Sequence, residues 1–587
     1  MSDLRKINNT TEDSNEWELA GCRDEVFALT HPWIHHYELG VPASIIVPDQ
    51  SLLWLLDSTS CHYPDHTAFL YYGTAITYAQ FAYLTDCFAR ALQRLDVQKG
   101  DRVAIALPNI PQYPIAFYAA LKVGAIVVPT NPLYTERELQ YQLTDSGARV
   151  LVLLDTFYPL VRAIRAQTAL EHIIVTSPAD FLPSILHTLY PLSQLLSGQP
   201  AAHFRKDLHN DETIHVMHTL LKLESNELAS QSPVAVSSND IAVLQYTGGT
   251  TGLSKGAILT HHALLANTLQ IRAWFPKIRD GEEVMLSVAP FFHAYGLTAG
   301  MNVSILLAAT MVLLPRFKVK DVLKAIRRYR PTLFPGIPTM YRALLHEGSM
   351  HPNDLQSIKY CISGAAPLPA SVRADFEAIT HGKLVEGYGL SEAAPVTHCN
   401  PLTEECRDGS IGLPLPSVDA TIANQETGEP VPVGELGEIM VKGPNMMLGY
   451  WQHEAESKAM FRDGWMRTGD LGRMDQDGFF YIVERIKDVI IASGFKVFPH
   501  EVEEVLSQHP FVGEAAVVGV PDEYRGETVA AFVVLKPEIE ETEETRQELL
   551  QYCKAALTAY KVPKILVFRK SLPKSLIGKA LRRELHV

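Results

Sequence analysis

Apolar and polar stretches alternate along the first half of the chain in an order that predicts a parallel β-sheet. The first such unit begins near residue 102. Its expected elements, in chain order, are a strand at 103–107, a helix at 112–124, a strand at 126–130, a helix at 135–147 and a strand at 149–154. Because these strands are apolar on both faces, we expect helices to cover both sides of the sheet.

The same order of elements returns further along the chain. The second unit is expected to contain a strand at 284–289, a helix of small residues at 296–308, a strand at 310–315, a helix at 318–330 and a strand at 332–336. The two units share no evident sequence identity, so the repetition is one of architecture or of chance. If it is architectural, it predicts two stacked α/β subdomains.

The pattern of expected elements changes after about Arg407, where short strands are separated by Gly and Pro. This pattern is typical of a small β-barrel or another β-rich subdomain. A third region begins near Lys487. Its expected elements are strands at 487–492, 514–520, 528–535 and 564–570 and helices at 500–508 and 545–560. This region has the size of an independent domain, and the charged turn 484–488 joins it to the rest.

Composition and charge exclude several classes of protein. The chain has 587 residues, of which 47% are hydrophobic, and this favours a large globular protein over a disordered one. A formal net charge of −15 argues against a surface that coats nucleic acid. The polar N-terminal segment lacks the apolar core of a signal peptide, so we expect a cytoplasmic protein. Seven cysteines form no CxxC pair, so we expect reduced thiols and no structural metal.

Two apolar segments bear on contact with a membrane. The run 305–315 is too short to span a bilayer and is predicted to be a buried helix that continues into a strand. The segment FLPSILHTLYPLSQLL at 181–196 is apolar but contains Pro, His and Ser. It is expected either to pack as an inserted loop or to touch a membrane surface. Peripheral membrane contact and homodimer formation therefore stay open.

The segment YTGGTTGLSKG at 246–256 has the composition of a polyphosphate-binding loop. Glycines let backbone N–H groups turn toward an anion, hydroxyls add donors, and Lys255 adds a positive charge. The hydroxyl donors are Thr247, Thr250, Thr251 and Ser254, and the glycines inside the loop are Gly248, Gly249 and Gly252.

The order of these residues differs from that of a Walker A loop, in which the hydroxyl follows the lysine. An apolar strand at 241–246 enters the loop, an extended segment leaves it, and Thr260 is expected to cap the next helix. No helix therefore begins directly after the loop, which weighs against a kinase or P-loop ATPase. For this segment alone, a mobile surface hairpin is the alternative.

Further segments have residues suited to a nucleotide. In EGYGLSE at 386–392, Tyr388 can stack on a base, and Glu392 is an oxygen ligand of the kind that Mg²⁺ prefers beside phosphates. An aromatic turn with a solvated glutamate is the alternative. A flat ring can also approach the small residues that follow an apolar strand, namely Gly364, Ala365, Ala366 and Pro367.

Two charged segments complete the set of candidates. In TGDLG, the carboxylate of Asp470 can accept both hydroxyls of a ribose, and Arg485 lies one strand hairpin away. An aspartate beside glycine is also a common turn residue. The segment PKSLIGKALRREL at 573–585 contains Lys579 after a glycine, and by itself it is typical of a solvated basic tail.

Taken together and in order, these motifs closely resemble the adenylate-forming superfamily of acyl-CoA synthetases, nonribosomal adenylation domains and luciferases. The motifs are YTGGTTGLSKG, GAAPL, EGYGLSE, GWMRTGD, ERIKDVIIASGFKVFPHEVE and PKSLIGKALRREL. The resemblance extends from about residue 45 to the end of the sequence. Within the superfamily, the forms EGYGLSE, SGFKVFPHEVEEVL and PWIHHYELGVPASI are most similar to bacterial long-chain fatty acid–CoA ligases.

The resemblance implies a fold and a reaction. The fold is α/β, with an N-terminal extension at 1–45 and a large AMP-binding domain at 46–485 that contains two stacked αβαβα subdomains and a small β-barrel. A smaller, mobile α+β domain at 486–587 would rotate about the hinge residue Lys487. ATP would activate a fatty acid as acyl-AMP with release of pyrophosphate, and CoA would then take the acyl group. Mg²⁺ is the implied cofactor, and the implied partners are these small molecules.

The resemblance also implies roles for individual residues. The loop from Thr247 to Lys255 would hold the departing phosphates, with Thr251 among the catalytic residues. Glu392 would ligate Mg²⁺, and Lys579 would reach the carboxylate and the α-phosphate. Residues 364–367 and Tyr388 would enclose adenine, while Asp470 and Arg485 would hold ribose. The other implied positions are Glu386, Gly387, Gly389 and Ser391 at the nucleotide and Gly494 beside the pantetheine channel.

Three positions qualify this assignment. His293 matches a position beside the carboxylate of the acid, and a core histidine is the alternative. Some long-chain members have a tryptophan gate nearby, where this chain has Tyr295 and Leu297, so gated entry is in doubt. Ser391 replaces the usual threonine and keeps its hydroxyl. The alternative activities are a CoA ligase for aromatic or medium-chain acids and an acyl-AMP ligase that loads a carrier protein in trans.

Overall fold

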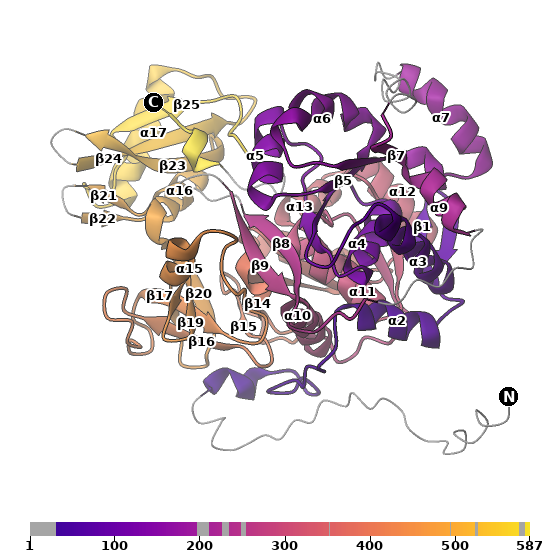
Figure 1. Cartoon of the computed structure of the whole chain (residues 1–587). Helices are drawn as coiled ribbons and strands as arrows, with labels where there is room; N and C mark the ends of the chain where they lie inside the picture. The colour runs from indigo at the N-terminus through magenta and orange to yellow at the C-terminus, as the bar shows by residue number, and fades with distance from the viewer. Residues whose placement is uncertain are drawn as a thin grey trace.

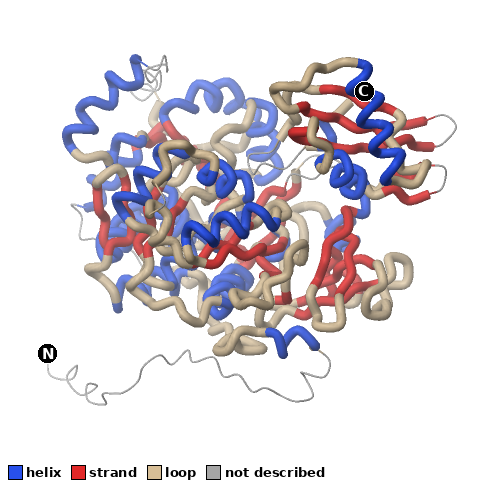
Figure 2. Tube along the Cα trace, turned by 180° about the vertical axis from the view of Figure 1, so that it is seen from behind, coloured by secondary structure: helices blue, strands red, loops and turns tan. Residues whose placement is uncertain are grey.

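The computed structural model describes residues 31–196, 211–225, 234–247, 254–351, 353–492, 495–522, 526–574 and 581–586. Figure 1 shows a large body, an orange β-rich subdomain beside it and a yellow C-terminal domain. Seen from behind in Figure 2, the C-terminal domain lies next to the β-rich subdomain.

The first unit forms a seven-stranded sheet in the order β7-β6-β5-β3-β4-β8-β9, in which only the edge strand β9 is antiparallel to its neighbour. The strands are β3 (Arg102–Ala106), β4 (Ile126–Pro129), β5 (Val150–Leu154), β6 (His172–Thr176), β7 (Ile214–Val216), β8 (Ile241–Thr247) and β9 (Lys255–Thr260). Every residue of β4 and β5 is buried, as their apolar pattern predicts.

Helices cover this sheet, and those at 112–122, 136–146 and 261–274 lie where the sequence predicts a helix. They include α3 (Tyr78–Arg94), α4 (Gln112–Lys122), α5 (Glu136–Ser146), α6 (Tyr158–Ile164), α9 (Met217–Ser225) and α10 (His261–Trp274). Local signals fix their ends: α5 begins at a capping box formed by Thr135 and Glu138 and ends at Gly147, whose φ is 61°. The predicted cap of α10 is confirmed, because the Thr260 side chain accepts the N–H of Ala263.

The second unit forms two short sheets, in the orders β10-β11-β1-β2 and β12-β13-β14-β15. The strands are β1 (Thr67–Tyr71), β2 (Thr74–Thr77), β10 (Val284–Ser287), β11 (Thr310–Leu313), β12 (Tyr360–Ser363), β13 (Lys383–Gly389), β14 (Val396–Cys399) and β15 (Leu413–Pro414). The strand predicted at 332–336 makes only single bridges, from Leu333 to Met285 and Tyr360 and from Gly336 to Ser363. These bridges place it between β10 and β12.

The helices of the second unit are α2 (Leu53–His62), η5 (Gly296–Asn302), α11 (Val303–Leu306), α12 (Val319–Tyr329), α13 (Pro338–Leu345) and α14 (Ala370–Thr380). The small-residue helix predicted at 296–308 begins as the π-helix η5 and continues as α11. A Cβ at Gly296 would lie 2.1 Å from the carbonyl oxygen of Pro290, so the close approach of these segments requires glycine.

The β-rich subdomain is an antiparallel sheet in the order β16-β17-β19-β18, with β20 paired to β19. Its elements are β16 (Asp419–Ala423), β17 (Gly437–Lys442), α15 (Glu454–Met460), β18 (Phe461–Arg462), β19 (Trp465–Met474) and β20 (Phe480–Arg485). The N-terminal segment packs on this subdomain through η1 (Pro32–His36). Trp33 contacts the ring of Phe480 with centroids 6.1 Å apart, and the hydroxyl of Tyr37 donates to the Pro414 carbonyl at 2.5 Å.

The C-terminal domain follows the short helix η7 (Ile486–Asp488). Its sheet has the order β22-β21-β24-β23, and β25 runs parallel to β24. Its elements are β21 (Ile490–Ala492), β22 (Phe495–Val497), α16 (Pro499–Ser507), β23 (Val512–Asp522), β24 (Gly526–Leu535), α17 (Glu543–Ala556), β25 (Ile565–Phe568) and η8 (Arg582–Glu584). Both long helices share one core cluster with the sheet, while Leu585 packs with Phe532 in a second cluster.

The apolar segment 181–196 is mostly a helix, α7 (Ser184–Leu196), and not the packed loop that we expected. Pro183 lies just before the helix, and the second proline of the segment, Pro191, lies inside it. The side chains of Ile185 and Leu189 remain 77% and 52% exposed. In the part of the chain that the structure describes, no helix is long and apolar enough to cross a bilayer.

Candidate active site

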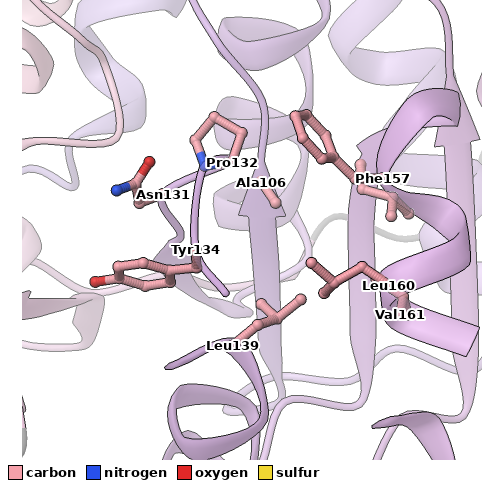
Figure 3. A pocket seen from close by; sticks show the side chains of 9 residues that line it. Ala106, Asn131, Pro132, Tyr134, Leu139, Phe157, Leu160 and Val161 are labelled. Carbon is pink, nitrogen blue, oxygen red and sulfur yellow. The ribbon is translucent and has the colours of Figure 1, made fainter. Parts of the chain in front are cut away.

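A hollow at the carboxyl ends of β3 and β5 is too small to be a substrate site. Ala106, Asn131 and Phe157 are among its lining residues (Figure 3), and its cavity is about 10 Å³. Such a cavity has room for about one water molecule. None of the residues that the motifs predict lines this hollow.

The predicted phosphate loop closes the hairpin between β8 and β9. The strand expected before the loop and the extended segment expected after it are β8 and β9, and Thr247 pairs with Lys255 in their register. The hydroxyl of Tyr246 donates to Asp145 Oδ2 at 2.6 Å and ties the end of β8 to α5. Ser254 is described at the end of the loop. Gly248, Gly249, Thr250, Thr251 and Gly252 lie outside the described residues.

Tyr450 connects the lysine of this loop to the predicted metal ligand. Its hydroxyl donates to Glu392 Oε1 at 2.7 Å, and Lys255 Nζ lies 5.7 Å from the centre of its ring. Lys255 also forms an ion pair with Glu456 at 3.0 Å. Burial, followed by the charge of Glu392, raises the pKa of Tyr450, so its hydroxyl stays protonated and acts as the donor. The motifs did not single out Tyr450, since a lone tyrosine after glycine has no sequence signal of its own.

Glu392 is a single half-buried carboxylate at the short helix η6 (Ser391–Ala393). Among the described residues, no group of three or more His, Cys, Asp or Glu could hold a metal ion alone. An ion bound at Glu392 would need further oxygen ligands from elsewhere. This arrangement fits Mg²⁺, which usually takes one or two carboxylates and completes its shell with phosphate oxygens and water.

The segment at 364–367 and the strand β13 lie side by side. Gly364 faces Tyr295, Ala365 has a left-handed φ of 70°, and Pro367 is exposed. The carboxylate of Glu386 accepts the Leu368 N–H at 2.9 Å and so ties the segment to β13. Burial raises the pKa of Glu386 to about 7.

The two glycines beside Tyr388 pack closely against other segments of the same chain. A Cβ at Gly389 would be 1.8 Å from the Pro395 carbonyl oxygen, and one at Gly387 would be 2.7 Å from the Ile362 side chain. These approaches leave no room for a side chain at Gly389 and explain the spacing of glycines in EGYGLSE.

Tyr388, Asp470 and Arg485 meet in a group that we call the ribose corner. The Tyr388 hydroxyl donates to Asp470 Oδ2 at 2.6 Å, and Arg485 Nε lies 3.1 Å from Asp470 Oδ1. Asp470 and Arg485 are direct partners in the pairing of β19 with β20. The side chain of Asp470 is 4% exposed and that of Arg485 is 36% exposed, so the arginine forms the open side of the corner.

His293 lies just before η5, next to Tyr295. Its Nδ1 accepts the Tyr295 N–H at 3.3 Å, which leaves the hydrogen of a neutral ring on Nε2. Burial lowers the pKa of His293 to about 4, so the ring is neutral at pH 7. A neutral donor at this place is compatible with both a contact to a bound acid and a core role.

Lys487, the predicted hinge residue, is in η7, directly after Arg485 of the ribose corner. Burial and then the positive charge of Arg485 lower its pKa. Gly494 and Lys579 lie outside the described residues. Arg582, which the motifs grouped with a basic tail, is instead paired with three carboxylates.

Comparison with known proteins agrees with this arrangement. A family model described as AMP-binding enzyme matches residues 56–451, and the model of the AMP-binding enzyme C-terminal domain matches residues 501–579. The chain therefore belongs to the AMP-binding enzymes, the adenylate-forming class that the motifs indicate. The predicted superfamily and fold class are confirmed.

Individual relatives refine the comparison. A long-chain-fatty-acid–CoA ligase of Bacillus subtilis (strain 168) is 48% identical over 556 residues, which cover 94% of this chain and 97% of the relative. Crystal structures of MatB from Rhodopseudomonas palustris are 28% identical and cover 91% of this chain. The ATP-bound form has a TM-score of 0.77 with 98% of its chain covered, and the apo form has 0.68 with 97% covered.

Proposed function

We propose that the protein is a long-chain fatty acid–CoA ligase, which uses ATP to form acyl-AMP and pyrophosphate and then transfers the acyl group to CoA. The observation that carries this proposal is the position of the segment 386–392. The segment contributes Tyr388 to the ribose corner, and its Glu392 contacts Tyr450, which lies beside Lys255. One short segment thus connects groups suited to a ribose with groups suited to phosphates. The names of the long-chain relatives support the acyl substrate.

Each group has a task in the proposed reaction. Lys255 and the loop residues Thr247–Gly252 and Ser254 would hold the β- and γ-phosphates, and Thr251 would act on the departing group. Mg²⁺ at Glu392 would neutralise phosphate charge. Residues 364–367 and Tyr388 would enclose adenine, and Glu386, Gly387, Gly389 and Ser391 would also contact the nucleotide. These roles amount to positioning and charge stabilisation, which account for most catalysis of this kind.

The C-terminal domain would provide the remaining groups. We place its boundary after Arg485 and its hinge at Lys487, and we assign Lys579 to acyl-AMP formation and Gly494 to the passage of CoA. Lys579→Ala is expected to abolish acyl-AMP formation, because the positive charge on the reacting oxygens is lost. Thioester formation from supplied acyl-AMP should continue. Equal loss in both half-reactions, each measured separately, would contradict this role.

Acid-dependent release of AMP, measured with and without CoA, tests the proposed function. We expect full turnover with long-chain acids and CoA, and only acyl-AMP without CoA. The panel should include short, long and aromatic acids. AMP formation confined to aromatic or medium-chain acids would replace the proposed substrate, and transfer to a carrier protein but not to CoA would replace the acceptor. No AMP with any acid would reject a ligase altogether.

We further propose that α7 contacts the surface of a membrane, where long-chain acids partition. Its exposed Ile185 and Leu189 belong to a helix that has no charged residue, and Arg328 lies near Pro183 at its start. An apolar face beside a cation suits an anionic lipid surface. Ile185→Glu together with Leu189→Glu should then reduce sedimentation with anionic vesicles. If the substitutions instead convert a dimer into a monomer, a second copy is the partner of this face.

A further inference from the structure

A cluster of ion pairs joins the last strand of the β-rich subdomain to the C-terminal domain. Arg582 Nη1 lies 3.1 Å from Glu484 Oε1 and 2.9 Å from Asp488 Oδ2, and Nη2 lies 3.0 Å from Glu503 Oε2. These four residues are called the hinge cluster. They come from β20, η7, α16 and η8, so the cluster spans both sides of Lys487.

Both carboxylate oxygens of Glu484 accept hydrogen bonds in this cluster. Its side chain is 5% exposed. Besides Arg582, its Oε1 accepts the Arg485 N–H at 3.0 Å, and its Oε2 accepts the His500 N–H at 2.8 Å. Two of the three donors therefore belong to the C-terminal domain. A buried carboxylate that loses such donors is strongly destabilised, because its charge is left without compensation.

The contacts of Arg582 differ in what a rotation of the domain would do to them. Glu503 and Arg582 are both beyond Lys487 and would move together. Glu484 lies before Lys487, so its contacts with Arg582 and His500 would separate if the domain turned about that residue. Contacts made in only one orientation are the ones that favour it.

We propose that Glu484 and Arg582 form a latch that holds the C-terminal domain in the described orientation, so that Arg582 is a positioning residue for acyl-AMP formation. This inference rests on the proposed function, since a latch matters only if the domain moves between half-reactions. The higher similarity to the ATP-bound than to the apo form of MatB supports the assignment to the ATP-dependent step.

Glu484→Gln and Arg582→Gln test the latch. The first removes one charge with little change of shape, and the second removes the opposite charge and shortens the side chain. Acyl-AMP formation should fall about tenfold, as expected when a charge-assisted hydrogen bond is lost. Thioester formation from supplied acyl-AMP should change less than about twofold, since it needs no such contact. Arg582→Lys, which keeps the charge, should recover part of the loss. Equal losses in both half-reactions, or no loss in either, would overturn the proposal.

A matched control separates the latch from general stability. Lys561 forms an ion pair with Glu501 at 2.6 Å within the C-terminal domain. Lys561→Gln should leave the ratio of the two half-reactions unchanged. Should either Gln variant fail to fold, the partial loss expected for Arg582→Lys still tests the latch, because it should shift the ratio in the same direction.

Hydrogen exchange gives a readout that is independent of turnover. In both Gln variants, the His500 amide and the segment 484–489 should exchange faster, while β23 and β24 keep wild-type protection. Faster exchange throughout the domain would assign a merely structural role to Arg582 and reject the latch. If the wild-type protein forms no AMP with any acid, the proposed function fails, and unchanged exchange at the hinge in the variants would separately reject the latch.

Discussion

Two adjacent residues of β20 serve different regions of the molecule. Arg485 faces Asp470 in the ribose corner, whereas Glu484 faces His500 and Arg582 in the hinge cluster. Successive side chains of a strand point to opposite faces, so one residue step separates the two regions. Both contain a buried carboxylate held by an arginine. They differ in that the ribose corner lies before Lys487, while the hinge cluster lies on both sides of it.

A buried carboxylate paired with an arginine can therefore serve ligand binding or domain motion, depending on which domain supplies its partners. Asp470, Arg485 and Tyr388 stay together whatever the C-terminal domain does. The contacts of Glu484 depend on that domain.

Asp470→Asn should have the largest effect, and it tests whether the ribose corner acts differently from the hinge cluster. Arg485 would lose its carboxylate partner and the ribose its acceptor, so both half-reactions should fall about 100-fold, each lost charge-assisted bond contributing about 1.5–3 kcal/mol. Both are affected because ribose is present in ATP and in acyl-AMP. Separate rates for the two half-reactions provide the check, and a loss confined to one of them would contradict this distinction.

Tyr388→Phe should have a smaller effect in the same region. It removes the hydroxyl that donates to Asp470 but keeps the ring, at a cost of about 1 kcal/mol, or roughly fivefold in the apparent affinity for ATP. The ATP concentration dependence of AMP release measures this change. Wild-type affinity in the variant would mean that the hydroxyl does not order Asp470 for binding.

Glu386 sharpens the comparison as a half-buried carboxylate that has no arginine partner among the described residues. Its pKa is raised from 4.5 to about 7, so the folded protein binds a proton that the unfolded chain has lost between these pH values. Its contribution to the free energy of unfolding is therefore present below pH 4.5 and is lost as pH rises to 7. Glu386→Gln should flatten the decline in Tm over this range by a small amount. An unchanged slope would show that Glu386 is ionised throughout.

Sequence patterns could predict most of the fold because each unit has a regular apolar period. Strands such as β4 and β5 are buried at every position, and caps such as Thr260 mark where a helix begins. A strand at 332–336 and a helix at 296–308 were also predicted. That the strand makes only single bridges and that the helix begins as a π-helix was not predicted, since both details depend on neighbours distant in sequence. Motifs also indicated Glu392, Asp470 and Arg485, because the residues next to them in the sequence are enough to identify them.

Partners of these residues could not be predicted in the same way. Tyr450 reaches Glu392 only because β9 and the segment after β17 lie together, and no spacing in the sequence records that contact. Arg582 belongs to a run of basic residues that is typical of a solvated tail. Its burial among three carboxylates arises from packing of the C-terminal segment on its own sheet.

The packing of η1 on the β-rich subdomain affects how the protein can be shortened. Family motifs place the start of the large domain near residue 46, but Trp33 covers Phe480 at the beginning of β20. A chain beginning at residue 46 would expose this aromatic surface to water and leave the Pro414 carbonyl without its Tyr37 donor. The exposed aromatic surface at the start of β20, the strand that ends in Glu484 and Arg485, would favour aggregation. Residues 31–45 therefore belong to the folded enzyme.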